Sequence, residues 1–245
     1  MLASTLFAVL ALGLPSLLSA TPVAVEDITA VEDVAVEGLA AAATVDFINP
    51  TDNGGSWLDK SNGLGEPLNV VISAKSTPDV LTLDGLLRYA HAIGFDKECL
   101  GQHQGDPQTA NLGDGRGDVN ETEVLRENFG IGGTIGTCLE SLEGGNHFRV
   151  FPQSTTGAIF LAVSQEEDLS EHHTIAPNGY NIGRDLLVAG AVGTKSHFNI
   201  KTFHLDTYVT VATNLTGLAT AGSVGINHGI AIDGIVTLLT ITKTT

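Results

Sequence analysis

The sequence is poor in basic residues, in aromatic residues and in cysteine. Lys and Arg together number 11 against 28 Asp and Glu, which gives a formal net charge of −17. Nucleic acids and anionic membrane surfaces are bound through basic patches, so this balance argues against both as partners. Aromatic residues make up 5% of the chain, beside 42% hydrophobic residues and 29 glycines. This composition is typical of a globular protein with many turns and a largely aliphatic core.

Long apolar runs are also missing after the amino terminus. No later stretch reaches the roughly 18 uninterrupted apolar residues that a membrane-spanning helix needs. Residues 1–20 contain an apolar run from 6 to 18 and end in Leu-Ser-Ala. This pattern is typical of a secretory signal peptide cleaved after Ala20, although no Lys or Arg precedes the run. The sequons at Asn120 and Asn214 fit glycosylation during export. The sequence therefore predicts a secreted, extracellular protein.

Residues 21–44 consist mainly of Ala, Val, Glu and Asp. Such a segment has few large apolar side chains for a core, so we expect a flexible leader or propeptide. The remaining 45–245 have the length of one domain, and we predict a single folded unit there.

Hydrophobic periodicity predicts the main elements of that unit. Residues 68–73 are a β-branched run suited to a buried strand, and Thr82 caps a helix that ends at Gly94 and buries Leu83, Leu86, Leu87, Ala90 and Ile93. Further strands are expected at 146–151, 158–163, 198–211 and 229–241. A second helix is expected from 182 to 192, burying Ile182, Leu186 and Ala189. This order predicts an α+β fold, an antiparallel sheet with two helices on one face and a split βαβ (ferredoxin-like) core with added strands.

Residues 96–145 show the least regular pattern and contain both cysteines, Cys99 and Cys138. Two cysteines in an exported chain most simply form one disulfide. A catalytic thiol is the alternative, but a free thiolate would be oxidised outside the cell. We expect an irregular segment closed by a Cys99–Cys138 bond.

Four short motifs carry a resemblance to a known family. They are Gly65-Glu66-Pro67-Leu68-Asn69, His147-Phe148-Arg149, His172-His173 and Arg184-Asp185. Over residues 64–192 the chain resembles the LssY C-terminal domain, in a secreted, fungal-type form. That domain often follows a membrane-bound phosphatase, whose signature is missing here, so the resemblance implies a fold and a polar cluster without a reaction. The chain departs from the family pattern at Phe151, at Asn178 and in the insertion 96–144.

Strand alternation places His147 and Arg149 on one face of their strand, opposite Phe148 and Val150. The second predicted helix should bring further polar residues to that face. The candidate ligand-binding residues are His147, Arg149, His172, His173, Arg184 and Asp185. Three interpretations remain open: a structural cluster, an anion or small-ligand site, and a divalent metal site such as zinc at His147, His173 and Asp185.

Hydrolase templates such as Gly-x-Ser-x-Gly and His-Glu-x-x-His do not occur in the sequence. No catalytic residue can therefore be named, and no cofactor is required by the sequence beyond the candidate metal. Two function classes remain. The first is an extracellular binding or interaction protein with an unknown ligand or protein partner, and the alternative is a metal-assisted hydrolase that uses the His/Asp cluster.

Overall fold

The computed structural model describes residues 45–61, 63–101, 106–199 and 203–245. The expected signal peptide at 1–20 and the expected leader at 21–44 lie outside these residues. All described residues belong to one compact unit. No described helix is long and apolar enough to cross a membrane.

The described residues contain three α-helices and ten strands. The helices are α1 (Leu83–Ala92), α2 (Gly133–Glu143) and α3 (Gly179–Ala191). The strands are β1 (Val70–Ile72), β2 (Phe95–Lys97), β3 (Thr109–Asn111), β4 (Asp118–Asn120), β5 (Glu123–Glu127), β6 (Gly145–Pro152), β7 (Ile159–Glu166), β8 (Gly193–Asn199), β9 (His204–Leu215) and β10 (Val236–Lys243). Short 3-10 helices are η1 (Pro50–Asn53), η2 (Cys99–Gly101), η3 (Leu169–Glu171) and η4 (Asn227–Gly229).

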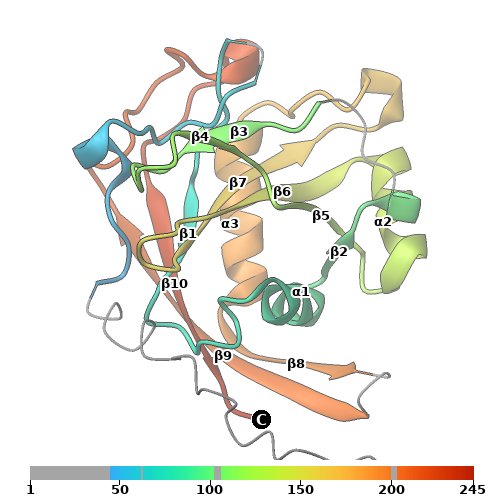
Figure 1. Ribbon diagram of the computed structural model, residues 1–245. Coiled ribbons are helices and arrows are strands. Elements are labelled where there is room, and N and C mark those ends of the chain that lie inside the picture. Colours follow the sequence, from blue (N-terminus) through green and yellow to red (C-terminus); the bar gives the residue numbers. More distant parts are fainter. Residues whose placement is uncertain (1–44, 62, 102–105, 200–202) are drawn as a thin grey trace, which may run out of the picture. The chain divides into compact units, whose positions relative to one another are not determined.

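Eight of the strands form one mixed sheet in the order β2-β5-β6-β7-β1-β10-β9-β8, and β3 pairs with β4 separately. The β1–β10 pairing is parallel and the other pairings are antiparallel. The sheet curls, so that β8 and β9 come round to contact α1 (Figure 1). The protein is mostly β. The predicted α+β fold, a two-helix ferredoxin-like antiparallel sheet, is therefore wrong.

The prediction failed because several strands carry no clean alternation of apolar and polar residues. β5 reads Glu-Val-Leu-Arg-Glu and lies inside the segment expected to be irregular. β8 reads Gly-Thr-Lys-Ser-His-Phe-Asn and is an edge strand with largely exposed side chains. Edge positions and buried charges remove the period-two signal on which a strand prediction rests.

Helix α1 forms as predicted. Thr82 Oγ1 accepts a hydrogen bond from the Gly85 amide at 3.1 Å, and Gly94 has a φ of 92° immediately after the C-cap residue. Side-chain capping satisfies one free amide of the first turn, and a positive φ suits glycine at the C′ position. The helix buries Leu86, Tyr89 and Ala90, whereas Leu83 is exposed.

Helix α3 exists near its predicted position, but it buries a different face. Ile182, Leu186 and Ala189 are exposed, while Gly183 and Leu187 are buried. A Cβ at Gly183 would lie 2.6 Å from the backbone carbon of Ser164 in β7. The missing side chain lets the helix backbone approach the strand closely, so the small-residue face turns inward.

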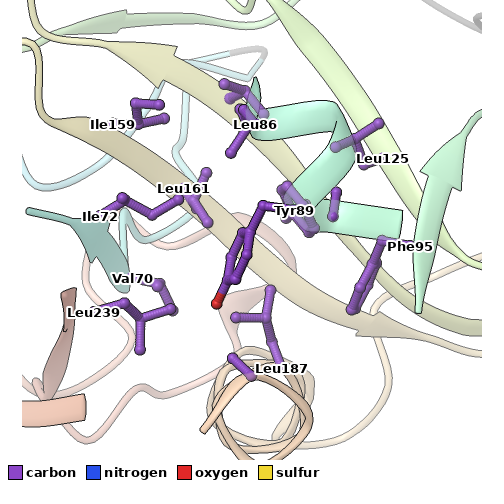
Figure 2. Close-up of a cluster of buried hydrophobic side chains, with 14 of the residues drawn as sticks. Val70, Ile72, Leu86, Tyr89, Phe95, Leu125, Ile159, Leu161, Leu187 and Leu239 are labelled. Atoms are coloured by element: carbon purple, nitrogen blue, oxygen red, sulfur yellow. The ribbon is translucent and has the colours of Figure 1, made fainter. Parts of the chain in front are cut away.

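The core on the helix side of the sheet joins α1 and α3 to the central strands. Tyr89 of α1 packs among Leu161, Val70 and Leu187 in the close-up view (Figure 2). Its ring meets that of Tyr208 edge-on at 5.4 Å, which ties α1 to β9. Its hydroxyl lies 2.9 Å from Thr210 Oγ1, so the buried polar atom is satisfied.

The opposite face of the sheet is apolar at one end and polar at the other. Trp57 and Phe160 pack there with ring centroids 5.5 Å apart, beside Phe151. Phe151 is opposite Phe160, and Arg149 and His147 follow it along β6 on the same face. The apolar core thus gives way along β6 to a layer of buried charged residues.

A disulfide joins Cys99 to Cys138, as predicted. It connects η2 with the middle of α2 across 39 residues of sequence. In the chain-entropy model, closing a loop of this length stabilises a fold by about 4 kcal/mol.

Candidate functional site

The buried polar layer is built by the register of three neighbouring strands. His147 of β6 is opposite Arg126 of β5 on one side and opposite Ser164 of β7 on the other. Residues opposite each other in an antiparallel pair project to the same face. Glu166 lies two residues after Ser164, so its side chain also reaches that face.

His147 lies at the centre of this layer and is fully buried. Its Nε2 is 3.3 Å from Ser164 Oγ, and its Nδ1 is 3.5 Å from Glu166 Oε1. Nδ1 makes no hydrogen bond with any described residue. Burial lowers the pKa of His147 to about 3, so the ring is neutral at physiological pH.

Arg126 bridges two glutamates beside His147. Its Nη1 lies 3.0 Å from Glu140 Oε2 in α2 and 2.8 Å from Glu166 Oε2 in β7. Burial raises the pKa of Glu140 to about 7 against the opposing effect of Arg126. Burial also acts to raise the pKa of Glu166, but the adjacent guanidinium helps to hold it below its usual value. Glu166 is therefore the fully ionised carboxylate of the group.

His173 follows η3 and approaches the same carboxylate from the surface. Its Nδ1 lies 3.8 Å from Glu166 Oε2 and makes no hydrogen bond with any described residue. Its side chain is 27% exposed, compared with 1% for His147. His172 is exposed, and the structure places no bonding partner beside its ring within the part of the chain it describes. His173 therefore approaches the buried carboxylate with a side chain that remains partly open to solvent.

These residues form a set that we call the Arg126 cluster. Its members are Glu98, Arg126, Glu140, His147, Glu166 and His173. When its three carboxyl groups are ionised and the imidazoles are neutral, one guanidinium leaves a formal charge of −2. The excess negative charge in a buried place favours an added cation.

Three residues of the Arg126 cluster have donor atoms close enough together to hold one metal ion. One ligand atom each from Glu140, His147 and Glu166 lie within 4.8 Å of one another. Donor atoms around one tetrahedral zinc ion are about 3.3 Å apart, since each lies near 2.0–2.1 Å from the metal. His147 Nδ1 lies 3.5 Å from Glu166 Oε1, close to that spacing. His173 Nδ1 lies 3.8 Å from the other carboxylate oxygen, Oε2, outside this three-residue group.

Ser164, His147 and Glu166 also have the connectivity of a Ser-His-Glu triad, with the hydroxyl at Nε2 and the carboxylate at Nδ1. Ser164 and His147 are both fully buried in the middle of the sheet. A nucleophilic hydroxyl must reach the substrate, and this one has no surface exposed to it. The geometry therefore suits an orienting hydrogen bond to the imidazole better than acyl transfer.

Arg149, the next residue on that face of β6, has its own acidic partners. We call Asp59, Glu66, Glu121 and Arg149 the Arg149 cluster. Arg149 Nη1 lies 3.2 Å from Glu121 Oε2, and Nε lies 3.5 Å from Glu66 Oε2. Burial raises the pKa of Glu66, and burial with the neighbouring Glu66 raises that of Asp59. Each arginine of the face is thus surrounded by three carboxyl groups.

A pocket of about 380 Å³ adjoins both clusters. Glu98 of the Arg126 cluster and Glu121 of the Arg149 cluster both line it, together with Glu123 and its ion-pair partner Lys97. The pocket wall therefore carries three glutamates and one lysine, and one glutamate comes from each cluster.

Arg184 and Asp185 lie in α3 with partners of their own. Arg184 binds Asp233 and the carbonyl of Ile235, and its Nε donates to Asp185 Oδ1 at 2.8 Å. Asp185 is 67% exposed. The structure thus brings His147 and His173 to one carboxylate and gives Arg149 a separate acidic group. Arg184 pairs with Asp185 and with the segment before β10.

Sequence reasoning missed Glu140, Glu166 and Arg126. Glu166 had a usable signal, because Ser164 and Glu166 continue the alternation of the predicted strand 158–163 on the face of His147. Glu140 had none, since α2 lies in the segment expected to be irregular and the chain offers 28 acidic residues. The predicted glycosylation sites Asn120 and Asn214 both have exposed side chains, on β4 and β9.

Comparisons with protein-family models, curated proteins and solved structures returned no match to this chain. The resemblance to the LssY C-terminal domain thus stays a prediction, and the candidate site rests on its own geometry.

Proposed function

We propose that the protein is a secreted binding protein whose ligand is a divalent metal ion, held by the Arg126 cluster. The observation that carries this proposal is the pair of imidazole nitrogens, His147 Nδ1 and His173 Nδ1, that face the carboxylate of Glu166 without a hydrogen-bond partner in the described chain. A neutral imidazole nitrogen beside an ionised carboxylate is favourable when a proton or a metal ion lies between them.

The donor types favour zinc over calcium or magnesium. Calcium and magnesium prefer oxygen ligands alone, whereas imidazole nitrogen suits zinc and its transition-metal neighbours. Glu140 and Glu166 supply the oxygens, and Arg126 orients both carboxylates. Ser164 beside His147 Nε2 would fix the ring with Nδ1 toward the metal, as outer hydrogen bonds commonly do for metal-binding histidines.

Binding is supported better than metal-assisted hydrolysis. A catalytic zinc keeps an open position that a substrate can reach. Glu140, His147 and Glu166 have side chains that are 0%, 1% and 9% exposed, and among the proposed donors His173 has the most exposed side chain. The disulfide supports an extracellular setting for such a protein, because disulfides persist in oxidising compartments.

Zinc titration of untagged, chelator-treated protein tests the proposal. Isothermal titration calorimetry and elemental analysis should give one zinc per chain. His173→Ala should weaken binding by about tenfold or more, because it removes a donor at the entrance to the site. His172→Ala is the matched control and should bind like the wild type. Equal behaviour of the two variants, or no stoichiometric zinc in the wild type, would contradict the proposal.

A further inference from the structure

The two cysteines of the disulfide lie next to two glutamates of the Arg126 cluster in the sequence. Cys99 follows Glu98, and Cys138 precedes Glu140 by two residues in α2. Both glutamates contact Arg126, Glu98 at 3.5 Å from Nε and Glu140 at 3.0 Å from Nη1. The covalent bond thus joins the two segments that hold these carboxylates on one guanidinium.

The body of helix α2 packs against β2, β5 and β6, but its start has little local restraint. Its N-cap residue Gly132 makes no side-chain cap hydrogen bond, and positive φ values occur at Phe129, Gly130, Gly132 and Gly133 just before or at its start. A glycine-rich entry with such angles has many accessible conformations once tertiary restraints are removed. The close approach of Gly136 to the Asn128 backbone and the Glu140–Arg126 pair hold the helix from the sheet side.

The outer side of α2 gives a reductant access to the bond. An apolar hollow of about 410 Å³ is lined by Leu100, Ile135, Cys138, Leu139 and Leu142. Ile135 is 72% exposed and Leu100 71%, so the hollow opens to solvent. Both cysteines are half-buried.

From these positions we infer that the Cys99–Cys138 disulfide controls the affinity of the metal site, so that its reduction releases the metal. The inference rests on the proposed metal-binding function. A dithiol reductant supplies two electrons and two protons, the sulfur–sulfur bond of the protein opens to two thiols, and the reductant closes its own disulfide. Freed from Cys99, α2 no longer holds the Glu140 carboxylate against Glu166 and His147, and one oxygen donor is lost.

The first experiment compares the wild type with a Cys99→Ser/Cys138→Ser double variant. Serine removes the sulfur–sulfur bond without leaving thiols that could re-oxidise. In a calorimetric titration, the double variant should bind zinc about fivefold or more weakly than the wild type. A change of this size is within the usual range of coupling between two sites. Far-UV circular dichroism checks that the variant is folded.

A second measurement uses the native chain and does not depend on the variant. The rate at which a phosphine opens the disulfide, followed by thiol alkylation and mass spectrometry, should be lower with zinc bound than without it. Magnesium in place of zinc should give no protection, and His173→Ala should need about tenfold or more zinc to reach the same protection.

The outcomes separate the two proposals. Failure of the wild type to bind zinc overturns the proposed function and this inference with it. Zinc binding by the wild type, with equal affinity in a folded double variant or no effect of zinc on the reduction rate, overturns the inference alone.

Discussion

Arg184 and Asp233 are joined by two parallel hydrogen bonds, from Nη1 to Oδ1 at 2.6 Å and from Nη2 to Oδ2 at 2.9 Å. The arginine belongs to α3 and the aspartate to the segment before β10. Bidentate pairs of this kind are strong and geometrically specific. The pair therefore fixes the first half of α3 against the segment that leads into the last strand.

Arg184→Ala should lower the free energy of unfolding by about 2–4 kcal/mol, because the arginine is 4% exposed and its loss leaves Asp233 without its partner. Urea denaturation measures the change. Asp185→Ala is the control, since it removes an exposed partner and leaves the Asp233 bonds in place, and it should cost less than about 1 kcal/mol. Equal losses in the two variants would contradict this role for Asp233.

The buried His147 should make the metal-free protein less stable in acid. Its pKa is about 3 in the fold, below its ordinary value of 6.5, so below pH 6.5 the unfolded chain binds more protons than the folded one. Stability is then lost as the pH falls, by about 2 kcal/mol between pH 6.5 and 5. Urea denaturation at the two pH values should show this loss in the wild type and a smaller one in His147→Gln. If His147→Gln loses as much stability in acid as the wild type, this explanation is contradicted.

Glu140 should make the stability of the protein depend on pH in the opposite direction. Burial raises its pKa to about 7 from 4.5, so its contribution is fully present below pH 4.5 and is lost as the pH rises through 7. Glu140→Gln carries no titrating group at this position. Between pH 4.5 and 8, the free energy of unfolding of the metal-free wild type should therefore fall by about 2–3 kcal/mol relative to that of the metal-free variant. Chemical denaturation across this range provides the measurement. A constant difference between the two proteins would mean that the carboxyl group does not titrate there.

The sequence predicted those elements whose side chains follow a simple period. Val70–Ile72 of β1 is uniformly apolar, and the leucines of α1 recur at helical spacing behind a threonine cap. β5 could not be found in this way, because Arg126 places a charge on a face where an apolar residue is expected. Tertiary partners stabilise that charge, and they are far away in the sequence.

The candidate site was predictable to the extent that its residues lie on recognised strands. His147 and Arg149 were assigned to one face, which their pairing with Ser164 and Ala162 bears out. The separation of Arg184 from Glu166 could not be read from the sequence, since it depends on which face α3 buries. That face is selected by the close approach of Gly183 to β7, a backbone contact that periodicity does not report.

Gly183→Ala tests this account of α3. A Cβ there would lie 2.6 Å from the Ser164 backbone carbon, so the helix would have to move and the variant should lose about 2 kcal/mol or more. Gly190→Ala in the same helix is the matched control. Its Cβ would find nothing nearer than the Ile93 carbonyl oxygen at 3.7 Å, so alanine should be neutral or stabilise by up to about 1 kcal/mol. Thermal unfolding distinguishes the two, and a stable Gly183→Ala would contradict the close-approach argument.

The parallel pairing of β1 with β10 also affects how the chain folds. Val71 is opposite Leu238, so a central strand from early in the described chain finds its neighbour near the C-terminus. Until β10 emerges during synthesis, β1 and β9 each lack a partner along one edge. Contacts of such long sequence separation slow folding, and unpaired strand edges promote aggregation. We therefore expect the nascent chain to depend on chaperones until β10 is made.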